Sequence, residues 1–263
     1  AILQSNKGGI VMENMIRSLL ITGFLFLVFT PVIQASDNAD HRKLLAKHYR
    51  LEKPDGTGPF PAVMMVPGCS GFQSDLFKGH YDAIQRRLVE LGFVTLRVDY
   101  LAARNASSCT EGVSSEDAAG DIRIAADYLT QQSFVKKGAV NVMGWSYGAS
   151  GALQALGRTW NREPVKVDAV IVYYPHCNFV QQKWESQIPV LVLSGVLDNV
   201  APIRFCKGLF VDLPVTVRKY DGAHHCFDMV GLPAKAQYEF GTIGYNETAA
   251  RAAWLEVSNF LRR

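Results

Sequence analysis

The sequence predicts an α/β protein with a mostly parallel central sheet, helices on both faces and an antiparallel N-terminal edge. Short runs rich in Val and Ile, bounded by Gly, Pro or Asp, recur after about residue 41, as is typical of buried strands. Segments with helical spacing of apolar residues separate these runs, and this alternation indicates a parallel sheet covered on both faces. The 263-residue chain is 48% hydrophobic and 19% charged. It can therefore bury a core, and disorder, collagen and coiled coil are excluded.

The expected strands lie at residues 62–66, 93–98, 140–145, 167–174, 190–193 and 215–220. Residues 44–51 precede them without an intervening helix, and we expect an antiparallel edge hairpin there. The expected helices lie at residues 81–91, 117–129, 149–156 and 248–261. Either Ser114 or Ser115 is available as the N-cap of the second helix. In the last helix, residues Ala252, Leu255 and Phe260 are expected to face inward.

The N-terminal residues have the layout of a secretory signal peptide, with a weakly positive start, an apolar middle and a small residue at the cleavage point. Residues 19–29 are apolar or nearly so and follow Arg17, Pro31 ends the run, and Ala35 precedes Ser36. The apolar stretch is shorter than the roughly 20 residues that a membrane-spanning helix requires. The alternative is an uncleaved anchor.

We therefore expect residues 1–35 to be upstream sequence plus signal peptide, with Met12 or Met15 as the start, and residues 36–263 to be one exported domain. No internal repeat and no Ser/Pro-rich linker divides the second part. The expected location is periplasmic or secreted, with no stable membrane span once the signal is cleaved. The formal net charge is +3 and no Lys/Arg run is present, which argues against nucleic acid as a partner.

All five cysteines lie in the expected exported domain, at Cys69, Cys109, Cys177, Cys206 and Cys226. In an oxidising compartment we expect one or two disulfides, and the odd count leaves at least one thiol free. No two cysteines have Cys-x-x-Cys or zinc-finger spacing. We therefore expect no metal site, and nothing in the sequence implies a cofactor.

A Gly-x-Ser-x-Gly motif, Gly144-Trp145-Ser146-Tyr147-Gly148, follows an expected strand and precedes an expected helix. The backbone bends tightly at such a turn, so both ends need small residues, and the bend lifts the hydroxyl clear of the sheet. The helix N-terminus that follows supplies the backbone N–H of Tyr147 to a developing oxyanion. We predict that Ser146 is a nucleophile; the alternative is a Gly-rich turn with an ordinary serine.

A serine nucleophile needs a base and an orienting carboxylate, which in this class of sheet follow in the order Ser, acid, His. Asp198 follows a fully apolar strand and is the predicted acid; the alternative is a turn or capping residue, and Asp221 resembles a simple turn. Either His224 or His225, after the last strand, is the predicted base; the alternative is a solvated loop. His176 ends an earlier strand and either lines the pocket or is structural.

The second oxyanion donor is expected from the loop that follows strand 62–66. This loop, Pro67-Gly68-Cys69-Ser70-Gly71, has small residues that leave its backbone free to approach a substrate. We assign the backbone N–H of Cys69. The thiol of Cys69 has no adjacent base in the sequence, and we predict that it is buried or in a disulfide.

These residues resemble the dienelactone hydrolase family of the α/β-hydrolase superfamily over roughly residues 43–262. The resemblance rests on 67–72, 98–100 with Arg104, 144–148, 174–177, 195–202 and 222–228. It implies an α/β-hydrolase fold, with Ser146 as nucleophile and Asp198 as acid. The base is the His of a His-x-Phe pattern, which favours His225 over His224. The resemblance also implies the backbone donors of Cys69 and Tyr147, and a disulfide near the site, for which Cys177 with Cys206 is favoured.

The sequence also departs from the pattern of the namesake enzymes. They have a cysteine nucleophile where Ser146 stands, a glutamate where Gly68 stands, and an arginine shortly after His-x-Phe where this chain has Asp228-Met229. Arg104 is expected either to hold a substrate carboxylate or to be a solvated loop residue. The implied activity is therefore cleavage of small-molecule carboxylic esters or lactones in general, through an acyl-enzyme, with Arg104, His176 and His224 at the substrate.

Two other functions remain as alternatives. A serine peptidase or amidase of the same fold also carries Gly-Trp-Ser-Tyr-Gly, usually together with a propeller or a long N-terminal domain. A non-catalytic exported binding protein that kept the fold is the non-enzyme alternative. A comparison of peptide with ester turnover separates the two hydrolases, and a fluorophosphonate probe separates an enzyme from a binding protein.

Overall fold

The structure is a computed structural model of the chain and describes residues 30–157, 164–180, 186–210 and 213–263. The expected apolar signal segment, residues 19–29, lies outside the described residues. The chain divides into two units, Ala1–Asp40 and His41–Arg263. The second unit holds the sheet and every predicted site residue. Among the described residues, no helix is long and apolar enough to cross a membrane.

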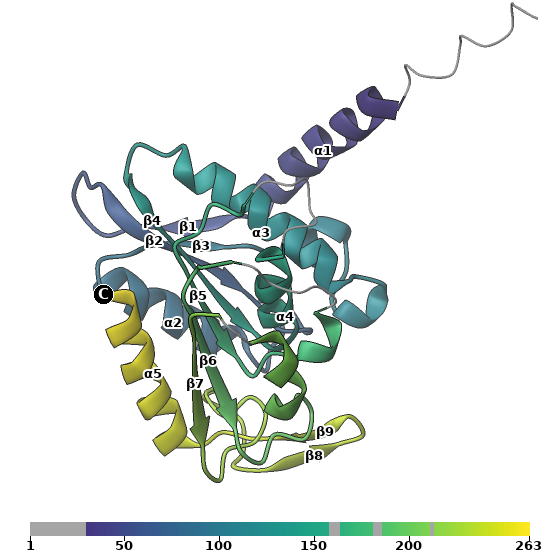
Figure 1. Ribbon diagram of the computed structural model, residues 1–263, viewed down its shortest axis with the longest axis vertical. Helices are drawn as coiled ribbons and strands as arrows, with labels where there is room; N and C mark the ends of the chain where they lie inside the picture. Colours follow the sequence, from purple (N-terminus) through teal and green to yellow (C-terminus); the bar gives the residue numbers. More distant parts are fainter. Residues whose placement is uncertain (1–29, 158–163, 181–185, 211–212) are drawn as a thin grey trace, which may run out of the picture. The chain divides into compact units, whose positions relative to one another are not determined.

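In the described part of the chain, seven strands form a mixed sheet in the order β1-β3-β2-β4-β5-β6-β7 (Figure 1). The strands are β1 (Arg50–Glu52), β2 (Phe60–Val66), β3 (Val94–Arg97), β4 (Val135–Trp145), β5 (Ala169–Tyr173), β6 (Val190–Gly195) and β7 (Val215–Tyr220). Neighbouring strands are parallel except β1 and β3, which are antiparallel. The predicted mostly parallel sheet with an antiparallel edge is confirmed.

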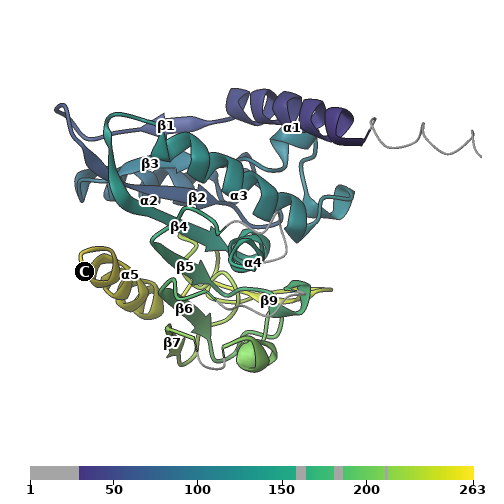
Figure 2. The same ribbon diagram turned by 45° about the horizontal axis from the view of Figure 1, so that its top comes forward.

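Helices cover both faces of this sheet (Figures 1 and 2). They are α2 (Lys78–Glu90), α3 (Ser115–Thr130), α4 (Ser146–Ala155) and α5 (Glu247–Leu261). Strand β2 shows why two layers are needed, because successive side chains of a strand point to opposite faces. Met64 and Val66 pack with α3 and α4 in one core, whereas Val63 and Met65 pack with α2 and α5 in a second core. All four side chains are fully buried.

The starts of two helices follow local capping rules. The Ser114 hydroxyl accepts a hydrogen bond from the Asp117 N–H, and Asp117 accepts one in return from the Ser114 N–H, which is a capping box. Ser114, rather than Ser115, is therefore the N-cap of α3. Asn246 caps α5 by accepting from the Ala249 N–H at 3.0 Å.

The predicted buried face of α5 is partly wrong. Phe260 faces the core as expected, but Ala252 is exposed and 62% of Leu255 is exposed. The buried stripe also contains Ala249, Ala253 and Val257. These residues, with Phe260, recur at spacings of three and four and so share one side of the helix. The two alanines let the helix approach the sheet closely, whereas Ala252 and Leu255 point outward.

The predicted edge hairpin at residues 44–51 is also wrong. Residues 44–47 form the end of α1 (Thr30–Lys47), and Leu45 on that helix is buried in the core. Strand β1 pairs with β3, with Leu51 opposite Leu96, rather than with β2. Because β3 lies between β1 and β2 in the sheet, the two consecutive strands form no hairpin.

Two loops that follow parallel strands are joined by a small hairpin, β8 (Ala236–Tyr238) and β9 (Gly241–Ile243). The Thr242 N–H donates to the Asn199 side chain at 2.8 Å, and Ile243 forms a β-bridge with His225. The hairpin therefore connects the loop after β6 to the loop after β7.

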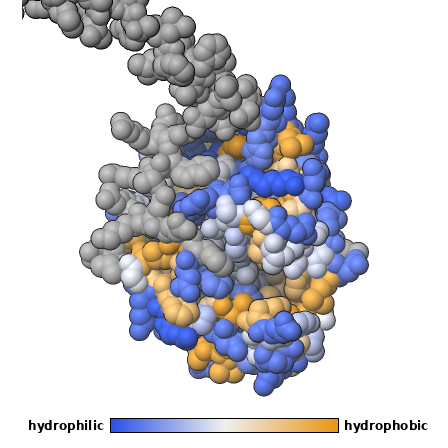
Figure 3. Space-filling model, turned by 90° about the vertical axis from the view of Figure 1, so that its right-hand side faces the viewer, coloured by the Kyte–Doolittle hydropathy of each residue, from blue (hydrophilic) through white to orange (hydrophobic). Residues whose placement is uncertain are grey.

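Figure 3 shows one face of the molecule, where hydrophobic residues form separate patches among hydrophilic ones.

Candidate active site

The turn between β4 and α4 places Ser146 in the left-handed region, with φ of 48°. A side chain at Gly144 would bring its Cβ to 2.8 Å from the Cα of Ala149, and one at Gly148 would overlap the carbonyl oxygen of Pro67. Both glycines are therefore required by close backbone approach. The strained backbone at Ser146 and its position at the first residue of a helix match the predicted nucleophile turn.

The structure brings Ser146, Asp198 and His225 together at the carboxyl ends of β4, β6 and β7. Nδ1 of His225 lies 2.9 Å from Oδ2 of Asp198, and Nε2 lies 2.9 Å from Oγ of Ser146. A carboxylate only accepts hydrogen bonds, so Nδ1 carries the proton and Nε2 accepts from the serine hydroxyl. This tautomer is the one that can remove a proton from Ser146.

Asp198 is held as an anion. Its side chain is fully buried, and its Oδ1 accepts hydrogen bonds from the N–H groups of Val200 at 2.9 Å and Ala201 at 2.8 Å. Burial opposes ionisation, but the charge of His225 and the hydrogen bonds from His225, Ala201 and Val200 outweigh it and hold the pKa of Asp198 below its ordinary value. The carboxylate therefore stays charged beside the imidazole at neutral pH.

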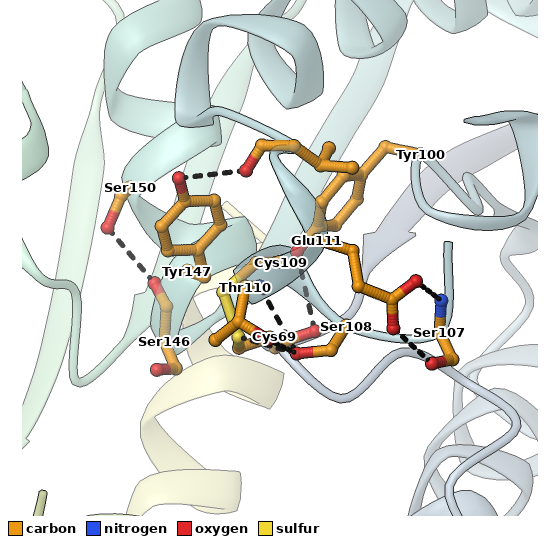
Figure 4. The surroundings of a disulfide bond; sticks show 12 residues. Cys69, Tyr100, Ser107, Ser108, Cys109, Thr110, Glu111, Ser146, Tyr147 and Ser150 are labelled. Atoms are coloured by element: carbon orange, nitrogen blue, oxygen red, sulfur yellow. Dashed lines mark hydrogen bonds between the residues drawn. A yellow bond between two sulfur atoms is a disulfide. The ribbon is translucent and has the colours of Figure 1, made fainter. Parts of the chain in front are cut away.

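The loop after β2 lies against the nucleophile turn. A Cβ built on Gly68 would lie 3.6 Å from the Cβ of Ser146, and the Gly68 N–H donates to the Tyr81 hydroxyl at 3.0 Å. The next residue, Cys69, forms a disulfide with Cys109, whose N–H also donates to the Cys69 carbonyl at 2.9 Å. Figure 4 shows this disulfide together with Ser146 and Tyr147.

The cysteine predictions are resolved by these contacts. The favoured pair, Cys177 with Cys206, forms a disulfide, so this prediction is confirmed. Cys69, expected to be buried or disulfide-bonded, is in the second disulfide. Cys226 is a free, buried thiol, as the odd count requires.

The two other histidines predicted for the site, His224 and His176, contact neighbouring groups of the protein. The ring of His224 lies with Nδ1 3.2 Å from the Leu197 carbonyl, on the loop that leads to Asp198. The Ser150 hydroxyl accepts from the His176 N–H at 3.1 Å, and it lies 3.1 Å from the His176 carbonyl and 3.2 Å from that of Ser146. Burial and the charge of His225 lower the pKa of His176.

Arg104 is neither solvated nor free for a substrate carboxylate, and both expectations for it need correction. Its guanidinium binds Asp121 at 2.6 Å and Asp117 at 3.3 Å, both on α3. Asp121 is 1% exposed and also contacts His41 at 2.6 Å. These carboxylates already neutralise the arginine, so we assign it no substrate. The sequence showed no sign of this pairing, because the partners meet only in the folded chain.

The structure also contains a buried polar cluster beside the turn that the sequence does not predict. Asp228 accepts hydrogen bonds from Nε1–H of Trp145 at 2.8 Å and from the Tyr174 hydroxyl at 2.7 Å. Nε2 of His80 lies 3.2 Å from Oδ2 of the same carboxylate. We call these four residues the Asp228 cluster. The available signal was a lone acidic residue in the otherwise apolar segment 226–230.

Within the described residues, no group of three or more His, Cys, Asp or Glu side chains is arranged to hold a metal ion. The site is instead a hydroxyl, an imidazole and a carboxylate in series, flanked by the start of a helix. Such an arrangement can activate a nucleophile by proton transfer.

Comparisons with known proteins give the family of the chain. The model of the dienelactone hydrolase family matches residues 48–263. The comparison with curated proteins finds no match.

Solved structures with the same fold have low sequence identity to this chain. Esterase 2 of Thermogutta terrifontis, phosphorylated by paraoxon, is 15% identical with a TM-score of 0.58, over 81% of this chain and 87% of that chain. A dienelactone hydrolase-like promiscuous phosphotriesterase from metagenomic libraries is 20% identical with a TM-score of 0.57, over 81% and 91%. Est1E from Butyrivibrio proteoclasticus is 15% identical with a TM-score of 0.56, over 82% and 94%. The chain belongs to the dienelactone hydrolase family, within the α/β-hydrolase superfamily.

Proposed function

We propose that the protein is a serine hydrolase that cleaves small-molecule carboxylic esters or lactones through an acyl-enzyme. The observation that carries the proposal is the continuous hydrogen-bond series from the Ser146 hydroxyl through His225 to Asp198, with both contacts at 2.9 Å. Family membership gives a hydrolase. The nucleophile is a serine rather than the cysteine expected of the namesake enzymes, so the proposed acyl-enzyme is an oxygen ester.

In the proposed reaction, Oγ of Ser146 attacks the ester carbonyl carbon while Nε2 of His225 takes its proton. The backbone N–H groups of Cys69 and Tyr147 stabilise the oxyanion of the tetrahedral intermediate. When this intermediate collapses, the C–O bond to the alcohol breaks, and Nε2 returns the proton to the leaving oxygen. Water then attacks the acyl-enzyme with the same histidine as base, which releases the acid and restores Ser146.

Apolar surface beside the acid supports an ester with an apolar portion. Val196 and Leu197 lie between β6 and Asp198 and are 50% and 49% exposed. Their backbones are held, because the Val196 N–H donates to the Tyr220 carbonyl and the Leu197 N–H donates to the Ala223 carbonyl, both at 2.9 Å. Two adjacent apolar side chains on a fixed loop offer contact area to a substrate at little entropic cost.

A fluorophosphonate probe tests whether Ser146 is an activated nucleophile. The similar Thermogutta esterase was phosphorylated by an organophosphorus compound, which supports this choice of reagent. We expect the native protein to gain one probe equivalent, located by mass spectrometry on the peptide that contains Ser146, and the urea-unfolded protein to gain none. A protein that turns over p-nitrophenyl esters without labelling at Ser146, or that binds them without turnover, contradicts the proposal.

The two disulfides also support export, because disulfides persist in oxidising compartments. We therefore propose that residues 36–263 act in the periplasm or outside the cell after cleavage of the signal peptide. Cys69, whose N–H is the proposed oxyanion donor, is itself one half of the Cys69–Cys109 disulfide. Removal of this bond is thus expected to affect activity as well as stability.

The double change Cys69→Ser with Cys109→Ser is expected to lower the free energy of unfolding by about 4 kcal/mol. It is also expected to lower kcat by up to about 10²-fold, because a displaced donor no longer meets the oxyanion. For comparison, Cys177→Ser with Cys206→Ser removes the other bond, which closes a loop of 29 residues rather than 40. Urea unfolding and ester turnover measure both effects; a loss of stability in Cys69→Ser with Cys109→Ser without any loss of kcat contradicts the proposed role of the Cys69 N–H.

A further inference from the structure

The Asp228 cluster lies in the core beside the proposed site, and the proposed mechanism uses none of its four side chains. They come from α2, the end of β4, the segment after β5 and the loop after β7. His80 is 4% exposed, Asp228 is 5% exposed, and Trp145 and Tyr174 are fully buried. A carboxylate at such a depth needs an explanation, because burial of a charge costs several kcal/mol unless it is paired and hydrogen-bonded.

Both oxygens of Asp228 are bound within the cluster. The Tyr174 hydroxyl donates to Oδ1 at 2.7 Å, Trp145 donates to Oδ2 at 2.8 Å, and His80 lies 3.2 Å from Oδ2. The carboxylate is satisfied, although Nε2 of His80 lies within ion-pair distance without forming a hydrogen bond. Polar networks of this kind give a core one arrangement, but apolar residues of the same volume are often as stable. Stability alone therefore does not account for the carboxylate.

Two partners of Asp228 adjoin the reacting groups. Trp145 directly precedes Ser146, and its indole stacks on Tyr173 with 5.6 Å between ring centroids. The ring of Tyr174 lies 4.5 Å from the imidazole of His225, centroid to centroid. Asp228 is on the same loop as His225, three residues later. The Asp228 carboxylate thus connects the nucleophile turn, the Tyr174 ring beside the imidazole, and the loop that carries His225.

The helix that contributes His80 also reaches the oxyanion loop. Its next residue, Tyr81, accepts from the Gly68 N–H at 3.0 Å, and its ring meets that of Trp145 edge-on at 5.2 Å. Gly68 precedes the proposed donor Cys69. The segments that carry the nucleophile, the base and the oxyanion donor therefore share one packed region beside the Asp228 cluster.

We propose that Asp228 is a positioning residue for the hydrolase reaction: through Trp145 and Tyr174 it holds the Ser146 turn and the His225 ring at the separation needed for proton transfer. The inference rests on the proposed function. A misplacement of about 1 Å in such a pair can cost about 10²-fold in rate. The cluster does not touch the substrate in the proposed mechanism, so it acts on kcat and leaves KM unchanged.

A double-mutant cycle tests this role. Asp228→Asn keeps the shape and removes the charge, and we expect it to lower kcat by about 10- to 100-fold with KM unchanged. Tyr174→Phe removes only the hydroxyl that donates to Asp228 and keeps the ring against His225, so it is expected to lower kcat less. If Asp228 acts through Tyr174, the double variant falls no further than Asp228→Asn alone.

The matched control is Asp121→Asn, because Asp121 is also a buried, ion-paired carboxylate but is bound by Arg104 and His41. It is expected to lose stability in urea without loss of kcat. The positioning role is overturned if Asp228→Asn loses stability but keeps kcat, as the control does, or if the two effects multiply in the double variant. Should Asp228→Asn not fold, an unchanged kcat in Tyr174→Phe overturns it.

The test separates this role from the proposed function. Ester turnover that survives Ser146→Ala contradicts the proposed function itself. Turnover that is lost in Ser146→Ala but unchanged in Asp228→Asn contradicts only the role of Asp228. A fall in kcat with constant KM in Asp228→Asn, together with the non-additive cycle, supports both.

Discussion

Replacement of Ser146 by alanine is expected to lower kcat for a p-nitrophenyl ester by about 10⁴- to 10⁶-fold, because it removes the atom that forms the acyl bond in the proposed mechanism. KM is expected to change little, since the variant keeps the proposed oxyanion loop and the apolar residues proposed to contact the substrate. The hydroxyl lies 2.9 Å from Nε2 of His225, so its loss leaves that base without a positioned nucleophile. Steady-state turnover at substrate saturation measures the loss.

The matched control is Ser258→Ala, which removes a buried hydroxyl that donates only within α5, to the Trp254 carbonyl at 2.8 Å. This variant is expected to keep its ester turnover. A Ser146→Ala protein that folds and retains activity within about tenfold of the parent would contradict the assignment, because loss of a triad member costs many orders of magnitude.

The sequence predicts most of the sheet because each buried strand of a parallel sheet is a continuous apolar run. The apolar run at 190–193 corresponds to β6. The amphipathic run at 215–220 corresponds to β7, which lies at the edge of the sheet and is only partly buried. The secondary structure of the N-terminal edge is harder to predict, because residues 44–51 are too few for periodicity to distinguish a helix end from a strand. In α5, the alanines at 249 and 253 carry little hydrophobic signal, so the larger Leu255 suggested the wrong face.

The residues selected for the site come from three loops that sheet topology places at one edge. Parallel strands end at the same side of a sheet, so a Ser after β4, an Asp after β6 and a His after β7 meet there. Sheet topology does not predict the contacts of Arg104 and Asp228. Their partners, Asp121 in one case and His80, Trp145 and Tyr174 in the other, are chosen by the packing of helices on the sheet. No motif in the sequence records those contacts.

Replacement of Asp198 by asparagine is expected to lower kcat by about 10⁴-fold. The amide keeps the size of the carboxylate, but its NH₂ group can donate to Nδ1 of His225. That hydrogen bond favours the tautomer with the proton on Nε2, which cannot accept the proton of Ser146. The matched control is Asp221→Asn, because Asp221 is the other acid that follows a strand after Ser146 and is exposed. It is expected to keep full turnover.

Acid titration gives the same variant a second readout. The pKa of Asp198 is held below its ordinary value by His225 and by the N–H groups of Ala201 and Val200, against the opposing effect of burial. A depressed folded-state pKa contributes stability above the ordinary pKa of aspartate, about 4, and this contribution is lost as the pH falls through the folded-state value. The difference in unfolding free energy between the parent and Asp198→Asn is therefore expected to be largest at neutral pH and to shrink in acid. Urea unfolding at a series of pH values measures it, and a difference that stays constant from neutral pH into this acid range would show that Asp198 is not held as the anion that the proposed base requires.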